Sequence, residues 1–307
     1  MTASRCLYRK QISDLLRLDP QWLIRKEEER YEKQIRRVAE TLCSRSGRLL
    51  VLLCGPSAAG KTTTALKLED QLRRFGRDAY TVSLDNFFRG YGKAPQLPDG
   101  SFDYESIEAL DLPLLEQCMQ QLLSDGKTAL PTFDFLTHSP KEERREFCVT
   151  DDAVVIFEGI HALHPLVRRH LPENQVFTLF INLMSPMMDG DTELLSNRDM
   201  RLVRRLLRDL RFRNSSVENT MDMWRQVVRG EELYMFPCVD NADATLDTTL
   251  AFETAMLAQE LLPQLYAVPK SSIYFEQVQR LIRALSIWQP LPLSLLNDNS
   301  LLREFIG

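Results

Sequence analysis

The stretch "LLVLLCGPSAAGKTTTAL", Leu49 to Leu66, joins an apolar run to a glycine-bounded loop and then to a segment of helix-forming residues. Residues 55–62 satisfy the pattern GxxxxGK[ST] without a mismatch. In such a loop the glycines let several backbone N–H groups point at one anion, and the following helix adds its positive N-terminal end. The stretch therefore predicts a buried strand, a phosphate-binding loop and a helix.

The loop also carries the side chains that a bound nucleotide needs. Lys61 would reach the outer phosphates, and the hydroxyl of Thr62 would ligate Mg²⁺. The residues expected to contact the nucleotide are Gly55, Ser57, Ala58, Ala59, Gly60, Lys61, Thr62 and Thr63. The alternative is a glycine-rich turn that happens to contain a lysine, and the motif alone does not separate motors, switches and kinases.

Outside the loop, apolar runs of strand length alternate with helix-like segments. Expected strands are 48–54, 78–84, 153–157, 176–183 and 242–250, and expected helices are 20–46, 61–75, 111–126, 251–262 and 273–288. This alternation predicts an α/β fold with a mostly parallel sheet covered by helices on both faces. We divide the chain into an N-terminal helical segment (1–46), a central domain that carries the phosphate loop (47–265) and a C-terminal helical extension (266–307).

Composition narrows the class of protein. With 44% hydrophobic and 26% charged residues, the chain is typical of soluble globular proteins, and a net charge of −5 argues against a general nucleic-acid binder. None of the six cysteines forms a CxxC pair, and the N-terminus lacks an apolar segment. We expect a cytoplasmic protein without a disulfide framework. His161, His164 and His170 are expected to be surface or satisfied core histidines rather than zinc ligands.

Two acidic residues follow predicted parallel strands. Asp85 comes directly after the second strand, and Glu158 ends the third. Ligand sites of open α/β sheets lie at such strand ends. Asp85 could accept the proton of a substrate hydroxyl that attacks a γ-phosphate, and Glu158 suits Mg²⁺ or its water shell. Asp85 could also be an ordinary aspartate that opens a turn, and Glu158 could be a satisfied carboxylate at a strand end.

The segment "NRDMRLVRRLLRDLRFRN", residues 197–214, is rich in arginine. Arg201, Arg204, Arg208 and Arg211 fall on one stripe at helical spacing. Such a helix could close as a lid over a triphosphate and neutralise the charge that develops during transfer. A solvated helix face and a nucleic-acid patch are the alternatives.

Taken together, these motifs resemble the uridine kinase (uridine–cytidine kinase) family, relatives of phosphoribulokinase and pantothenate kinase, from about residue 50 to 260. The resemblance rests on "GPSAAGKTT", "SLDNFF", Phe102-Asp103, "PTFDFLTHSPKEE" (131–143), "VVIFEGI" and "RLVRRLLRD". The segments "MWRQVVRGEELYMFP" and "NSLLREFIG" look like those of a bacterial nucleoside kinase branch.

The resemblance implies a P-loop NTPase fold, with five parallel strands and an arginine-bearing lid, and it implies roles for matching residues. Asp85 would be the general base, assisted by Lys61 and Arg208. Arg205 and Arg213 would contact the nucleotide, and Thr62 and Glu158 would hold Mg²⁺. The acceptor would be bound by Asp103 at the ribose hydroxyls, His138 at the pyrimidine edge, Phe133 and Arg205.

Three positions depart from the family pattern. Phe133 stands where eukaryotic members have a tyrosine, and Met223 replaces a glutamine. The family's Arg-Gly-Arg-Asp is here Arg213-Asn214-Ser215-Ser216, which removes the second arginine. The residues for phosphate chemistry are thus intact, whereas some that read the nucleoside have changed.

We therefore expect a kinase that transfers the γ-phosphoryl of ATP or GTP, with Mg²⁺, to the 5′-hydroxyl of a ribonucleoside such as uridine or cytidine, in pyrimidine salvage. We also expect a homo-oligomer with no nucleic-acid or membrane partner. Three alternatives stay open: a kinase of another small alcohol, a non-catalytic nucleotide-dependent regulator, and an RNA-binding module.

Overall fold

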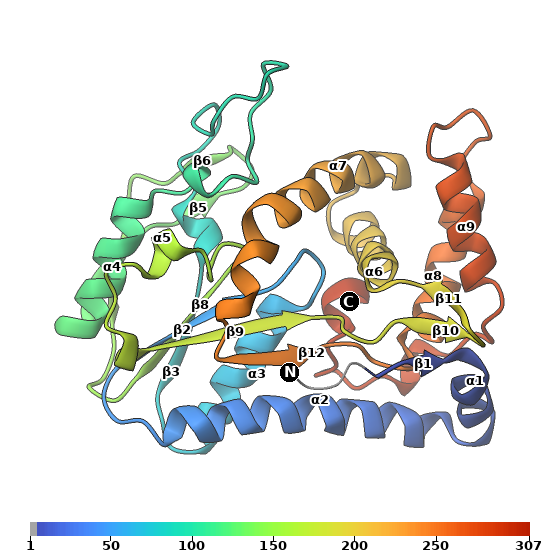
Figure 1. Ribbon diagram of the computed structural model, residues 1–307, viewed down its shortest axis with the longest axis horizontal. Coiled ribbons are helices and arrows are strands. Elements are labelled where there is room, and N and C mark those ends of the chain that lie inside the picture. The colour runs from blue at the N-terminus through green and yellow to red at the C-terminus, as the bar shows by residue number, and fades with distance from the viewer. Residues whose placement is uncertain (1–4) are drawn as a thin grey trace.

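A five-stranded parallel sheet forms the centre of the computed structural model, which describes residues 5–307 (Figure 1). Its strands, in spatial order, are β12 (Ala244–Asp247), β9 (Val176–Asn182), β2 (Leu49–Cys54), β8 (Val154–Glu158) and β3 (Ala79–Ser83). Every neighbouring pair is parallel. The predicted α/β fold with five parallel strands is confirmed.

The central strand β2 is buried on both faces, as its unbroken apolar run predicts. Because side chains alternate along a strand, Leu49 and Val51 join one core while Leu50 and Leu52 join the other. The first core includes the buried faces of α2 (Pro20–Cys43), α3 (Lys61–Arg74), α6 (Asn197–Phe212) and α8 (Glu253–Tyr266). The second includes those of α4 (Leu112–Ser124) and α5 (Pro165–Arg168).

Local sequence explains where several helices begin. Asp19 and Asp111 accept backbone N–H bonds at the starts of α2 and α4, and each of these helices has a proline in its first turn. Ser196 and Asp199 form a capping box at the start of α6. Gly60 precedes α3 with a φ of 90°, a left-handed conformation that glycine adopts without strain.

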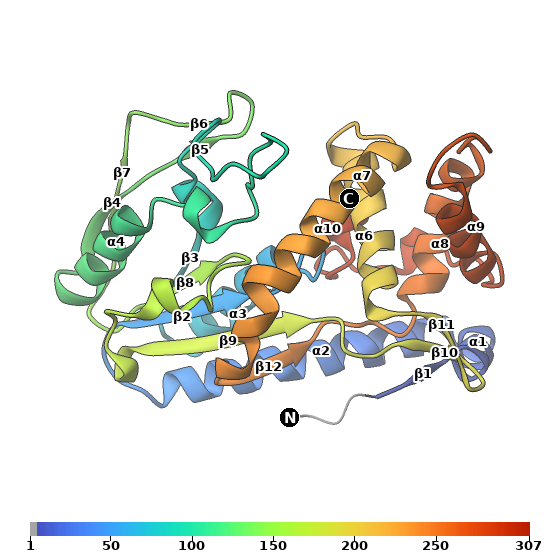
Figure 2. The ribbon, with the colours of Figure 1, turned by 45° about the horizontal axis from the view of Figure 1, so that its top comes forward.

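Smaller elements surround this core. Antiparallel pairs are formed by β5 (Phe133–Asp134) with β6 (Ser139–Pro140), by β4 (Lys127–Leu130) with β7 (Arg145–Cys148), and by β10 (Met187–Asp189) with β11 (Thr192–Leu195). β1 (Leu7–Tyr8) joins β10 in parallel. In Figures 1 and 2, α7 (Val217–Gly230) stands between the β5–β6 hairpin and α6.

The terminal segments share the main core. Residues of α1 (Arg9–Leu18), α9 (Phe275–Leu285) and α10 (Arg303–Ile306) belong to the same apolar cluster as α2, α3 and the sheet. The predicted helices at 20–46 and 273–288 are present, and the proposed division at 46 and 265 stays a prediction. Within residues 5–307, no helix combines the length and apolar character needed to cross a membrane.

Candidate active site

Strand register brings the phosphate loop and two carboxylates to one edge of the sheet. Glu158, at the end of β8, is opposite Leu53 of β2 on one side and Ser83 of β3 on the other. The loop begins one residue after β2 ends, and Asp85 lies two residues beyond Ser83. Three chain segments that are far apart in sequence therefore meet at the carboxyl ends of parallel strands.

The loop has the backbone shape that a phosphate cradle requires. Ala58 and Gly60 both have positive φ, at 60° and 90°. A Cβ atom added to Gly55 would lie 2.5 Å from the carbonyl oxygen of Ile181, so only glycine fits there. The ammonium of Lys61 folds back and donates to the Pro56 carbonyl at 3.2 Å. The loop therefore has the backbone conformation and the lysine that a phosphate site needs.

Asp85 lies in a short helical turn, Leu84–Phe87, that Ser83 caps through the Asp85 N–H. Its side chain reaches solvent. The surrounding protein nevertheless desolvates the carboxyl and raises its pKa above the ordinary value. Lys61, Arg213 and Arg208, in that order, oppose the rise. A carboxylate with a raised pKa therefore lies in the electrostatic field of three cations. This arrangement suits proton abstraction beside a phosphate.

Thr62 and Glu158 offer oxygen ligands next to the loop. The Thr62 hydroxyl lies 3.5 Å from a carboxylate oxygen of Glu158, which is buried. Burial raises the pKa of Glu158, and the charge of Lys61 acts in the opposite direction. A buried carboxylate beside a hydroxyl fits a hard cation such as Mg²⁺, because oxygen donors are the ones that it prefers.

Two arginines of α6 support the loop rather than face an open cleft. Arg201 is paired with Glu231 at 2.8 Å and donates to the Ser57 carbonyl at 3.0 Å. Arg204 is paired with Glu253 and donates to the carbonyl of Ala58 at 3.4 Å. Both guanidinium groups are buried, so they hold the loop from behind.

The other arginines gather around Asp209, which is fully buried. Arg205 and Arg213 lie 2.6 Å and 3.1 Å from its carboxylate, and Arg208 lies 3.9 Å away. Within residues 5–307 the Nε atom of Arg208 has no hydrogen-bond partner. Burial, with Arg213 and Arg205 nearby, lowers the pKa of Arg208 to about 10. Arg208 is therefore only loosely paired with Asp209, and its charge acts on Asp85.

The fourth arginine of the predicted stripe lies apart from this group. Arg211 forms an ion pair with Glu260 on the surface between α6 and α8. The helix therefore does not present its arginines as a single row that could close over a triphosphate as a lid. Its arginines divide into loop supports, a cluster around Asp209, and a surface pair.

Two of the four predicted acceptor residues lie at a cavity of about 320 Å³, whereas Arg205 is bonded to Asp209 and Ser57. Phe133 and His138 line the cavity, together with Phe88, Gly90, Tyr91, Tyr104, Ala109 and Phe135. The rings of Phe88 and Phe133 are 5.9 Å apart, edge to face. Asp103 lies outside this lining and is buried, with hydrogen bonds from Tyr234 at 2.8 Å and Arg229 at 3.3 Å.

Two titratable groups near Asp103 were given no role by the sequence. Burial, followed by repulsion from Glu231, raises the pKa of Glu105 to about 7. Burial also lowers the pKa of His161 to about 4, so this ring is neutral at pH 7. Within residues 5–307 neither ring nitrogen meets hydrogen-bond geometry, although the Glu105 backbone is near. The expectation of a surface or satisfied core histidine is not met at His161.

Glu105 should make stability depend on pH. Its folded pKa of about 7 lies above the ordinary 4.5, so the stability it contributes below pH 4.5 is lost as pH rises towards 7. The wild type should lose unfolding free energy between pH 5 and pH 8, and Glu105→Gln should lose about 2 kcal/mol less. This is smaller than the full pKa shift implies, because Glu105 is partly exposed. Urea unfolding at both pH values measures this, with Glu29→Gln at an exposed position of α2 as a surface control. Parallel pH profiles of wild type and Glu105→Gln would contradict it.

The altered segment after Arg213 has a local structural use. Ser216 caps α7 by accepting the Asn219 N–H at 3.2 Å, and the buried Ser215 accepts from the Asn219 side chain at 2.7 Å. Asn214 adopts a positive φ of 48° at the turn. The position of the family's second arginine is thus occupied by Ser215, which bonds to the Asn219 side chain next to the capping residue Ser216.

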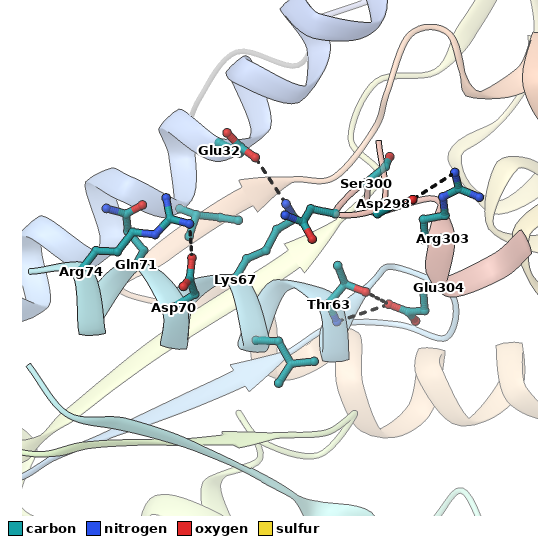
Figure 3. Close-up of a pocket in the computed structure, with 13 residues that line it drawn as sticks. Glu32, Thr63, Lys67, Asp70, Gln71, Arg74, Asp298, Ser300, Arg303 and Glu304 are labelled. Carbon is teal, nitrogen blue, oxygen red and sulfur yellow. Dashed lines mark hydrogen bonds and ion pairs between the residues drawn. The ribbon is translucent and has the colours of Figure 1, made fainter. Parts of the chain in front are cut away.

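The first turn of α3 also meets the C-terminal segment. Glu304 of α10 accepts hydrogen bonds from the Thr63 hydroxyl at 2.6 Å and from its backbone N–H at 3.4 Å (Figure 3). Leu301 packs so closely that a Cβ added to Gly60 would lie 2.5 Å from its Cδ1 atom. The residues expected to bind a nucleotide are therefore in contact with the end of the chain.

Several known proteins are similar to this chain. A model of the Phosphoribulokinase / Uridine kinase family matches residues 50–255. A uridine kinase of Lactobacillus helveticus is 27% identical over 181 residues, covering 59% of this chain and 77% of its own length. A uridine kinase of Halobacterium salinarum is 27% identical over 192 residues, covering 62% and 76%. The structure of a possible uridine kinase from Bacillus stearothermophilus has a TM-score of 0.47 and 19% identity, over 70% of this chain and 98% of that one.

The fold and the loop define a P-loop kinase, an enzyme that uses a nucleoside triphosphate. The matched region takes up most of the chain, and the protein belongs to the Phosphoribulokinase / Uridine kinase family. The predicted family is therefore confirmed.

Proposed function

We propose that this kinase transfers the γ-phosphoryl of ATP or GTP to the 5′-hydroxyl of a ribonucleoside, with uridine or cytidine as the preferred acceptor. The observation that carries the proposal is the position of Asp85 at the sheet edge where the phosphate loop begins, within the electrostatic reach of Lys61 and Arg208. A regulator that only senses nucleotide has no need of a base beside its phosphate cations. The names of the uridine kinase relatives support the choice of acceptor.

In this mechanism Asp85 takes the proton of the acceptor hydroxyl as that oxygen attacks the γ-phosphorus. Lys61 and Arg208 neutralise the charge on the transferring group, and Asp209 holds the arginine in place. Arg205 and Arg213 contact the nucleotide. Thr62 and Glu158 would hold Mg²⁺, which would neutralise part of the phosphate charge. Catalysis is then mostly positioning, with the protein excluding water.

The acceptor site is formed by Asp103 and the aromatic cavity. A planar base fits among the rings of Phe88, Phe133 and Tyr104, because stacking on aromatic side chains is favourable for every base. His138 lies at the same cavity and can bond to the base edge. Asp103 can accept both ribose hydroxyls once its bonds from Tyr234 and Arg229 rearrange. We further propose a cytoplasmic homo-oligomer that acts in pyrimidine salvage.

An ADP-release assay over a panel of nucleosides and small alcohols tests the function. We expect uridine or cytidine to stimulate turnover most strongly. Phe133→Leu should raise KM for that nucleoside about tenfold, since a base stacked on an aromatic ring gains roughly 1–3 kcal/mol. The control is Leu136→Ala, whose side chain in the same hairpin is 93% exposed. Stimulation by a sugar phosphate or pantothenate alone would assign another acceptor, an outcome favoured by Ser215 in the place of the family's second arginine. No stimulation by any compound would refute the proposal.

A further inference from the structure

The last eleven residues, 297–307, are built into the molecule rather than loosely attached. The side chains of Leu301, Leu302, Phe305 and Ile306 are at most 1% exposed. Arg303 fixes the backbone by donating to the carbonyls of Leu296 and Gly307 at 2.9 Å and 2.8 Å. A segment held in this way has a defined position relative to the phosphate loop.

That position places a carboxylate on donors which a phosphate needs. The N–H groups at the start of α3 have no partner within the helix, and together with the loop they are the expected anion site. Glu304 accepts from the backbone N–H and the hydroxyl of Thr63, as Figure 3 shows. Its other oxygen lies 3.7 Å from Nη1 of Arg208, the cation that we assign to the transferring phosphoryl group.

The residue after Glu304, Phe305, also contacts an arginine of α6. The guanidinium of Arg204 lies 5.1 Å from the centre of the buried Phe305 ring. Next to it, Leu301 covers Gly60. The contact of Phe305 with Arg204 ties the C-terminal segment to the arginine that supports the phosphate loop from behind, and so helps to fix the position of Glu304.

We propose that the C-terminal segment is an intramolecular competitor of the donor nucleotide, and that Glu304 is its competing anion. A phosphate bound at the first turn of α3 must displace the Glu304 carboxylate, because two anions cannot share the Thr63 donors. Displacement also releases Arg208 for the phosphate. The affinity for donor nucleotide is then set by how readily residues 297–307 leave this position.

The test measures Mg·ADP affinity by calorimetry, without any acceptor. Glu304→Gln keeps the size of the side chain and removes its charge, so we expect about tenfold tighter binding than in the wild type, as the loss of one charged hydrogen-bond competitor predicts. The matched control is Glu260→Gln, which removes a carboxylate paired with Arg211 on the same helix α6 but away from Thr63. Its affinity should equal that of the wild type.

Hydrogen exchange on the wild type gives a second readout that needs no variant. The N–H groups of Arg303, Phe305 and Gly307 donate to the carbonyls of Ser300, Leu302 and Arg303, so they exchange slowly in the free protein. Saturating Mg·ADP should speed their exchange if the segment is displaced.

Three results would overturn the competition. They are equal or weaker Mg·ADP binding by Glu304→Gln than by the wild type, slower exchange of residues 303–307 with Mg·ADP, and no nucleotide binding by either protein. These readouts are independent of the acceptor. A protein that binds as expected but shows no nucleoside-stimulated turnover would refute the proposed function and leave this inference standing.

Discussion

Asp85→Asn should lower kcat for nucleoside phosphorylation about a thousandfold, within the range that a general base contributes. The amide cannot take the proton of the attacking hydroxyl, while its size and hydrogen-bonding atoms stay nearly the same. Because Lys61, Thr62 and the loop amides are untouched, nucleotide affinity should stay within about twofold. Single-turnover phosphorylation measures the chemical step, and calorimetry with Mg·ADP measures the binding.

The control for this variant is Asp70→Asn. Asp70 lies on α3 in an exposed ion pair with Arg74, so the same chemical change there should leave kcat within about twofold. Full activity in Asp85→Asn would remove Asp85 as the base. A parallel loss of nucleotide binding would show instead that Asp85 holds the loop or its metal.

The wild-type pH profile offers a further check on the same residue. The raised pKa of Asp85 means that the acidic limb of kcat/KM should lie above the range of an ordinary aspartate, with activity lost as pH falls through it. Glu105, with a pKa of about 7, interacts with Asp85. The acidic limb of kcat/KM therefore reports the coupled titration of both carboxyls rather than of Asp85 alone.

The sequence predicted the sheet well because each signal was local. The apolar runs of β2 and β8 and the glycine pattern of residues 55–62 lie within short stretches of chain. Glu158 and Asp85 could be assigned to one edge because parallel strands end together. The family motifs then supplied roles that no single stretch carries.

Other parts of the site left no local signal. Glu231 and Glu253 pair with Arg201 and Arg204 across 30 and 49 residues of sequence, so nothing in α6 shows which of its arginines are buried. Asp209 was visible as an i,i+4 partner of Arg205, but its contact with Arg208 depends on the fold. The meeting of Glu304 with Thr63 joins residues 241 positions apart, and neither residue alone points to it.

The burial of Arg204 leads to the largest expected effect on stability. Its guanidinium is completely buried and donates to Glu253 at 2.7 Å and to the Thr248 carbonyl at 2.9 Å. Arg204→Met should therefore lower the unfolding free energy by about 3–5 kcal/mol, because it leaves the Glu253 carboxylate buried without its partner. Guanidinium chloride unfolding at pH 7 measures the loss.

Two further variants separate this explanation from a general loss of packing. Arg211→Met, two turns further along the same helix, breaks only the surface pair with Glu260 and should cost less than about 1 kcal/mol. Arg204→Met combined with Glu253→Gln should recover part of the stability, because the double variant buries no unpaired charge. If the double variant is no more stable than Arg204→Met alone, the buried charge is not the cause. Arg204 would then act through its packing on Phe305, and α6 would support the phosphate loop by shape rather than by ion pairs.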